Sequence, residues 1–96
     1  MTLDRVAELV QQLADLLGRV GEGAAARGMQ ALATEARSAT SEADRRTVVR
    51  KTLALYRGMG SLQDLVLQDS VGVRPEQAEL HALRSALFDE ARRQIR

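Results

Sequence analysis

The single histidine of the chain, His81, is the first candidate for chemistry, because histidine serves as a metal ligand and as a general acid or base. Two ligands that share a metal on one helix lie three or four residues apart. The positions at those spacings from His81 hold Gln77, Ala78, Arg84 and Ser85. None of them is a carboxylate or a second histidine, so we expect no metal site and a flank position beside an apolar stripe.

Catalysis by a nucleophile or by paired carboxylates has little support either. Ser61 or Ser70 could combine with His81 and a carboxylate, but the sequence lacks a nucleophile-elbow pattern and a strand to carry it. The chain has no cysteine, which excludes thiol chemistry and disulfides. The helix dipole already explains acidic pairs in expected first turns, namely Glu42 with Asp44 and Glu76 with Glu79. We expect a non-enzyme without catalytic, cofactor-binding or metal-binding residues.

A glycine-flanked segment, Gly58-Met59-Gly60-Ser61, is superficially similar to a phosphate-binding loop. It lacks the lysine and the strand-to-helix setting of a P-loop, and it has too few glycines for a dinucleotide-binding fingerprint. We expect a tight turn between two helices. The alternative is a loop whose bare backbone packs against a partner.

An acidic stretch follows this segment and is the first candidate for a binding surface. Between Asp64 and Glu79 four carboxylates are opposed only by Arg74. Charges at two helix starts and a polar loop would explain most of them, and a patch that docks on a basic partner is the functional alternative. The predicted partner-binding residues are Gly58, Met59, Gly60, Ser61, Asp64, Asp69, Glu76 and Glu79.

Basic side chains concentrate just before this region. They are Arg45, Arg46, Arg50, Lys51 and Arg57. A solvated helix face is the usual meaning of such a cluster. Binding of nucleic acid would be better supported by an extended basic surface with exposed aromatic rings, yet Tyr56 and Phe88 occupy apolar-face positions and the net charge is only +1. Nucleic acid is therefore the less favoured partner.

Length and composition predict one small helical domain over residues 1–96. Of its residues 45% are hydrophobic, mainly Ala, Leu and Val, and two are aromatic, which favours helix over strand. Asp4 and Glu8 interrupt the region where a signal peptide would have its apolar run, and no segment has the uniform apolar character of a membrane span. We expect a cytoplasmic protein, a location that the absence of cysteine also suits.

Hydrophobic spacing predicts four main helices and no sheet. The first is expected over about residues 3–20, capped by Thr2 and ended by Gly21 and Gly23. Its apolar stripe comprises Leu3, Val6, Leu9, Val10, Leu13, Leu16, Leu17 and Val20. The second has a stripe of smaller residues, namely Ala25, Met29, Leu32, Ala36 and Ala39.

The third helix should begin at a capping box formed by Ser41 and Asp44 and end at Gly58. Its apolar side comprises Val48, Val49, Thr52, Leu53, Leu55 and Tyr56. A short helix or turn near residues 62–67 and a connection over 68–74 lead to Pro75, which opens the last helix. That helix carries Leu80, Leu83, Leu87, Ala91 and Ile95 on one face, which completes a small bundle.

The segment from Leu53 to Leu67 resembles an uncharacterised family of small bacterial helical proteins that share a Gly-Met-Gly-Ser-x-x-Asp-Leu segment. The matching residues are Tyr56, Gly58, Met59, Gly60, Ser61, Asp64 and Leu65, whereas Arg57, Leu62 and Gln63 depart from the pattern. No function is settled for that family. By analogy, small cofactor-free helical proteins of this kind are similar to the immunity proteins encoded beside bacterial toxins, which block an active site.

Three functional hypotheses follow. The first is a protein-binding module, most plausibly an immunity or antitoxin-type inhibitor that applies residues 58–79 to a basic cleft of a toxin. The second is a regulatory or nucleic-acid-associated protein that uses the basic side of the third helix. The third is a structural homo-oligomer held by an apolar stripe that the bundle leaves uncovered.

Overall fold

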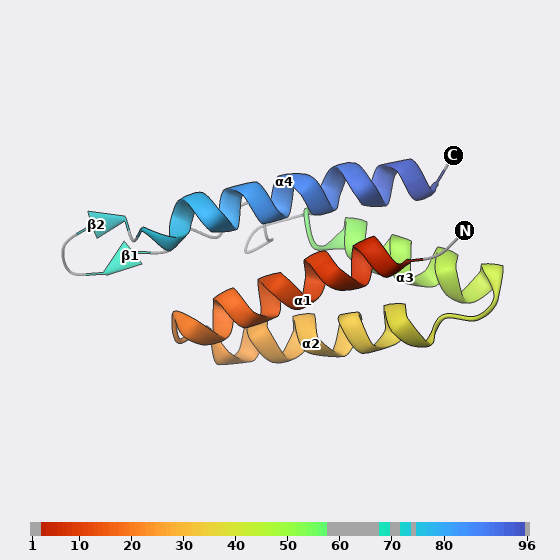
Figure 1. Ribbon diagram of the computed structural model, residues 1–96, viewed down its shortest axis with the longest axis horizontal. Coiled ribbons are helices and arrows are strands. Elements are labelled where there is room, and N and C mark those ends of the chain that lie inside the picture. Colours follow the sequence, from red (N-terminus) through yellow and green to blue (C-terminus); the bar gives the residue numbers. More distant parts are fainter. Residues whose placement is uncertain (1–2, 58–67, 70–71, 74, 96) are drawn as a thin grey trace.

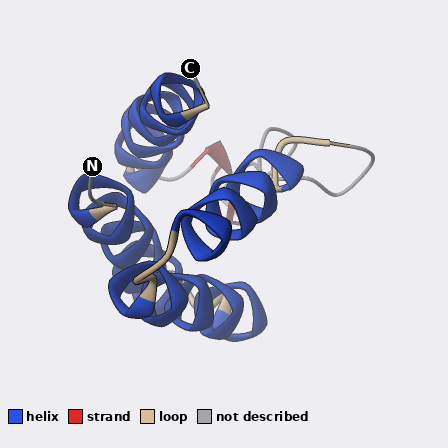
Figure 2. Ribbon diagram, turned by 90° about the vertical axis from the view of Figure 1, so that its right-hand side faces the viewer, coloured by secondary structure: helices blue, strands red, loops and turns tan. Residues whose placement is uncertain are grey.

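The computed structural model describes residues 3–57, 68–69, 72–73 and 75–95, and these form an all-helical bundle (Figure 1). Its helices are α1 (Asp4–Arg19), α2 (Gly23–Ser38), α3 (Glu42–Ala54) and α4 (Glu76–Gln94). Each helix packs against two others in a ring, α1 against α2 and α4, and α3 against α2 and α4 (Figure 2). The four predicted helices are therefore confirmed. Within the described ranges, no helix is both long and apolar enough to cross a membrane.

The helix α1 supplies the centre of the core. Its leucines and valines recur at three- and four-residue steps and so lie on one broad side of the helix. Eight of its 16 residues are buried, and the predicted bounds agree with the observed ones to one residue. The predicted cap, Thr2, lies outside the described residues, and Leu3 stands at the N-cap position without a side-chain hydrogen bond.

The helix α1 ends at a turn whose backbone geometry suits glycine. Gly21 has a φ of 86°, a left-handed conformation that costs glycine little. The N–H of Glu22 donates to the carbonyl of Leu17 at 2.8 Å, and the N–H of Gly21 donates to that of Gly18 at 3.3 Å. These two bonds form a Schellman motif, which satisfies the last carbonyls and turns the chain into α2.

The apolar face of α2 agrees with the predicted one at its larger residues and differs at three alanines. Met29, Leu32 and Ala36 are buried as expected, but Ala25 is exposed, and Ala26 instead packs against the core. Ala33, which the prediction omitted, is also buried. Alanine occupies so many positions of α2 that the spacing alone does not determine which side of the helix faces the core. The assignment can shift by about one residue.

The helix α3 begins as predicted and ends earlier. The N–H of Asp44 donates to the Ser41 hydroxyl at 3.0 Å, and the N–H of Ser41 donates to the Asp44 carboxylate at 3.4 Å, which confirms the capping box. The helix ends at Ala54, and the next residues form a turn, so termination precedes the predicted Gly58. Only three of its 13 residues are buried, namely Val48, Val49 and Thr52.

The helix α4 packs through a narrower face than expected. Leu80, Leu87 and Ala91 are buried, while Leu83 is half-buried. Pro75 occupies the N-cap position, one residue before the helix. The prediction for Ile95 is wrong: the helix ends at Gln94, and the side chain of Ile95 is 61% exposed instead of joining the core.

The predicted connection over 68–74 contains a small element that the spacing did not indicate. Two strands of two residues each, β1 (Gln68–Asp69) and β2 (Gly72–Val73), pair antiparallel with Gln68 opposite Val73. The expectation of a protein without any sheet fails at this hairpin only. The predicted short helix or turn at 62–67 lies outside the described residues.

Candidate functional site

The residues predicted to bind a partner from the acidic side are only partly described. Five of them lie outside the described residues: Gly58, Met59, Gly60, Ser61 and Asp64. Asp69 lies in β1, and Glu76 and Glu79 lie in the first turn of α4, with Glu76 half-buried. Docking through these residues stays a prediction.

Glu79 has a partner within the chain. Both of its carboxylate oxygens accept hydrogen bonds from Nη2 of Arg19, each at 3.0 Å. The pair joins the first turn of α4 to the last turn of α1. Because the two side chains are 48% and 60% exposed, the pair stabilises the fold by at most about 1 kcal/mol, yet it offsets the charge of Glu79.

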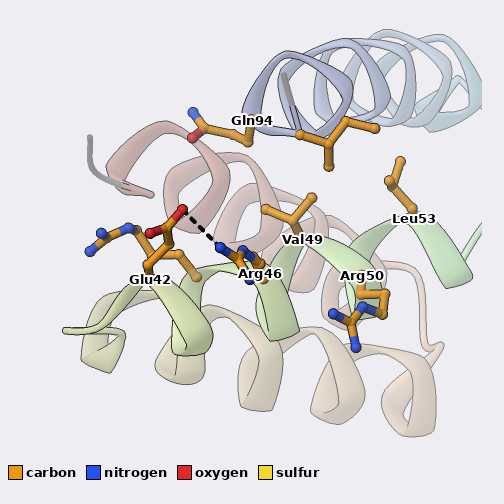
Figure 3. Close-up of a pocket in the computed structure, with 8 residues that line it drawn as sticks. Glu42, Arg46, Val49, Arg50, Leu53 and Gln94 are labelled. Carbon is orange, nitrogen blue, oxygen red and sulfur yellow. Dashed lines mark ion pairs between the residues drawn. The ribbon is translucent and has the colours of Figure 1, made fainter.

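The described residues form a groove elsewhere, between α3 and the C-terminal end of α4 (Figure 3). Its volume is about 460 Å³. Six of its lining residues belong to α3 and two to the end of α4: Glu42, Arg45, Arg46, Val49, Arg50, Leu53, Gln94 and Ile95. The long wall is thus one helix and the short wall is the end of another.

One continuous stripe of α3 faces the groove. Its lining residues recur at three- and four-residue steps, which places them on one side of the helix. From Glu42 to Leu53 the stripe has a length of about 16 Å, because each residue advances the helix by 1.5 Å. The groove therefore runs along about three turns of α3.

Apolar side chains form a strip within the groove. Val49 and Leu53 point from α3 toward α4 (Figure 3), with Val49 buried and Leu53 half-buried. Ile95 borders them from α4 and is the one large hydrophobic side chain found exposed in the described part of the chain. Through Ile95, the groove presents apolar surface to water.

Positive charge surrounds the apolar strip. Nη2 of Arg46 lies 3.1 Å from Oε1 of Glu42. Within the described residues, Arg45 and Arg50 form no ion pair. Three arginines against one glutamate give the groove a formal charge of +2, although the whole chain carries only +1. Lys51, predicted with this cluster, binds Glu35 of α2 at 2.7 Å, and Arg57 lies beyond the helix.

A second hollow, of about 590 Å³, adjoins the groove at Ile95. Its other lining residues are Asp89, Arg92 and Arg93 of α4. Arg93 binds Glu90 at 2.8 Å, so its charge is partly offset. The exposed Ile95 thus lies between two hollows, and arginines line both of them.

The two aromatic residues fasten the end of α3 to α4. The rings of Tyr56 and Phe88 meet edge to face, 5.0 Å between centroids and 64° between planes. The Tyr56 hydroxyl donates to the backbone carbonyl of Arg84 at 2.6 Å, and the guanidinium of Arg92 lies 5.6 Å from the Phe88 ring centroid. Neither aromatic ring lines the groove, so the groove itself offers no ring for base stacking.

The Tyr56 phenol has a strongly shifted pKa. Burial away from water raises this pKa well above its usual value of 10.0, Arg84 partly lowers it, and Asp89 raises it further. The phenol is therefore neutral and hydrogen-bonded at neutral pH. We infer a structural role for it, since its proton is already committed to the Arg84 carbonyl.

The groove combines cationic and aliphatic side chains. Arginine stays protonated and presents several N–H donors, which suits carboxylates, while the aliphatic strip suits apolar side chains. In the part of the chain that the structure describes, no three histidine or acidic side chains gather closely enough to hold a metal ion. His81 is exposed on α4.

Comparison with protein-family models, with curated proteins and with solved structures finds no match to this chain. Of the residues that carry the resemblance of segment 53–67, only Tyr56 is described. Function must therefore be argued from the site itself.

Sequence analysis identified the arginines and missed the groove. It treated Leu53 and Ile95 as core residues, and it did not consider Gln94. One signal was present: Arg45, Arg46 and Arg50 alternate with Val49 and Leu53 on the same side of α3, whereas a simple amphipathic helix separates charged and apolar residues onto opposite sides.

Proposed function

We propose that this protein is a non-catalytic protein-binding module whose partner docks in the groove between α3 and α4. The observation that carries the proposal is the coincidence, in one groove, of an exposed Ile95 with two arginines, Arg45 and Arg50, that form no ion pair among the described residues. Protein interfaces commonly have an apolar centre with a polar rim, and arginine is enriched in them.

The proposal changes the surface that sequence analysis favoured. The acidic hypothesis needs residues 58–79 to be available to a basic partner, and within that range Glu79 is already bound to Arg19. The groove supports docking through Ile95 and Arg50, which are exposed and not bound to other described side chains. An inhibitor of the immunity type remains one protein of the proposed class, and its toxin would then contact the groove.

The experiment compares the partners retained by four versions of the purified chain. Tagged wild type, Ile95→Asp, Arg50→Glu and Arg27→Glu are each used to capture proteins from the cells that make the chain. Arg27 is the matched control, because it is an exposed arginine of α2 outside the groove. We expect a partner that wild type and Arg27→Glu retain and that the two groove variants lose.

A fifth version, Asp69→Lys with Glu76→Lys, tests the acidic surface in the same experiment. If this version loses the partner while Ile95→Asp and Arg50→Glu keep it, the groove is the wrong surface and the acidic hypothesis replaces the proposal. Retention of the partner by every version would also overturn it.

A further inference from the structure

From the shape and charge of the groove between α3 and α4 we infer the chemistry of its occupant: a single amphipathic helix with acidic residues along its edges, supplied by another protein. This inference rests on the proposed function and makes it more specific. It follows from the backbone of the groove walls, the length of the groove, its charge and the remaining helix faces of the chain.

Hydrogen bonding favours a helix over an extended segment. An extended peptide gains affinity by pairing its backbone with an exposed sheet edge. The long wall of this groove is α3, and between its ends the backbone N–H and C=O groups of α3 are already paired within the helix. An occupant must therefore satisfy its own backbone, as a helix does.

The dimensions fit a short helix. The α3 wall is about 16 Å long, which corresponds to about 11 residues of a helical partner. A helix of this length presents anchors at three- and four-residue steps on one face. Such a face can cover the strip formed by Val49, Leu53 and Ile95.

The charge fits acidic edges. Arg45 and Arg50 flank the apolar strip without a carboxylate partner among the described residues. A guanidinium pairs favourably with a carboxylate, often through two parallel hydrogen bonds. Glutamates or aspartates beside the apolar anchors of the partner helix would complete these pairs, whereas lysines would be repelled.

Among the helices that the structure describes, a second copy of this chain has none that could act as the occupant. The apolar faces of α1, α2 and α4 are buried in their own core, and α3 carries basic residues. Docking of any of them would require the bundle to open. A nucleic acid would satisfy the arginines but leave the apolar strip without a partner, because no aromatic ring lines the groove to stack on bases.

The test uses a designed peptide of about 15 residues, close to the length at which an isolated helix forms in water. It carries leucines at three- and four-residue steps and glutamates beside them. A second peptide replaces the glutamates with lysine, and a third replaces the leucines with serine. Binding to the full chain is measured by isothermal titration calorimetry at two salt concentrations. We expect the second and third peptides to bind at least about tenfold more weakly than the first.

The decisive part of the experiment exchanges the charges of the groove arginines. Arg45→Glu with Arg50→Glu should invert the preference, so that the lysine peptide binds and the glutamate peptide does not. A misfolded variant would lose the specific binding of both peptides, so an inversion of the preference stays informative if the double variant is less stable. Arg27→Glu with Arg37→Glu, two exposed arginines of α2, should leave the preference unchanged.

The failures of the two proposals can be told apart. If no peptide binds but Ile95→Asp still loses the cellular partner, the helical acidic occupant is wrong and the groove remains the binding surface. If the glutamate peptide binds while every groove variant retains the cellular partner, the proposed function is wrong. An RNA oligonucleotide that binds more tightly than the glutamate peptide, or a dimer that Ile95→Asp dissociates, would overturn the inference in favour of that occupant.

Discussion

α1 buries eight of its 16 residues, whereas α3 buries three of its 13. α3 has a capping box at its start, at Ser41, and is followed by a turn in which Tyr56 contacts α4. The difference in burial leaves one side of α3 uncovered by the rest of the fold. In this bundle, the surface suited to docking lies where the core is thinnest.

The polar side chains show the same division. On the α1/α2 side, Nε2 of Gln11 donates to Asp15 and Gln30, and Arg37 donates to Oε1 of Gln11. On the α3/α4 side, Arg45 and Arg50 have no such partners among the described residues. Polar groups that are already satisfied contribute to the fold, and those that are not are available to a ligand.

The largest expected effect tests the core itself. Leu13, at the centre of α1, is fully buried, so Leu13→Ala should lower the free energy of unfolding by about 2–5 kcal/mol. Leu53→Ala should cost about half as much, because Leu53 is half-buried at the edge of the groove. Urea unfolding followed by circular dichroism measures both. Equal losses of unfolding free energy in the two variants would contradict the difference between the densely packed α1 and the thinly covered α3.

A smaller effect is expected at the start of α3. Ser41→Ala should cost about 1 kcal/mol, because the N–H of Asp44 loses its acceptor. The Ser41 hydroxyl, followed by the backbone N–H groups of Thr40 and Ser41, lowers the pKa of Asp44 below its usual value of 3.8. The stabilisation by Asp44 is thus complete above that value and is lost as the pH falls through the lowered pKa of the folded state.

Urea unfolding at neutral and at acidic pH checks the cap prediction. Thr47→Ala is the matched control, since the Thr47 hydroxyl donates only to the carbonyl of Ala43 in the same helix. An equal loss of unfolding free energy in Thr47→Ala would show that the cap has no special importance for α3.

A loss of stability of similar size is expected at the C-terminal end of α3. Tyr56→Phe removes the hydrogen bond to the Arg84 carbonyl but keeps the ring against Phe88, so a loss of about 1 kcal/mol is expected. The raised pKa of Tyr56 gives this contribution a pH dependence. In the unfolded chain the Tyr56 phenol ionises above a pH of about 10, whereas in the folded protein it stays neutral. The free energy of unfolding therefore falls as the pH rises through this range.

Urea unfolding of wild type and Tyr56→Phe at neutral pH and above pH of about 10 tests this dependence. The variant should lack the part of the alkaline decline that Tyr56 causes. Identical pH profiles for the two proteins would refute the assigned role of burial at Tyr56.

The smallest effect on stability is expected in the groove. Ile95→Asp and Arg50→Glu alter exposed side chains without described partners, so each should change the free energy of unfolding by no more than about 0.5 kcal/mol. The same variants should bind the cellular partner at least about tenfold more weakly. Thermal melts alongside the capture experiment separate the two effects. A lower melting temperature equal to that of Leu13→Ala would show that these residues serve the fold.

The success of sequence analysis depended on how strongly the local pattern constrained each element. The leucine stripe of α1, the turn at Gly21 and the capping box at Ser41 were predicted because each is decided within a few residues. The rotation of α2 was less certain, and Ala25 was assigned to the core in place of Ala26, since neighbouring alanines give no contrast. No glycine or proline stands at residues 54–57 to mark the early end of α3.

The groove could not be predicted because its residues are brought together only by the fold. Leu53 and Ile95 are 42 positions apart in the sequence and become neighbours where α3 meets the end of α4. The periodicity that correctly assigned Leu80 and Leu87 to the core also assigned Ile95 there, although the helix ends one residue before it. A helical pattern shows which residues share a face, and it does not show where the neighbouring helix stops.

The contact between Tyr56 and Phe88 also gives the molecule a built-in optical reporter. The chain has one tyrosine and no tryptophan, so its intrinsic emission originates almost entirely at the junction of α3 with α4. Any ligand that moves these two helices relative to each other would change that emission. A groove ligand that moves α3 relative to α4 would therefore be detectable in the unlabelled protein, through residues outside the lining of the groove.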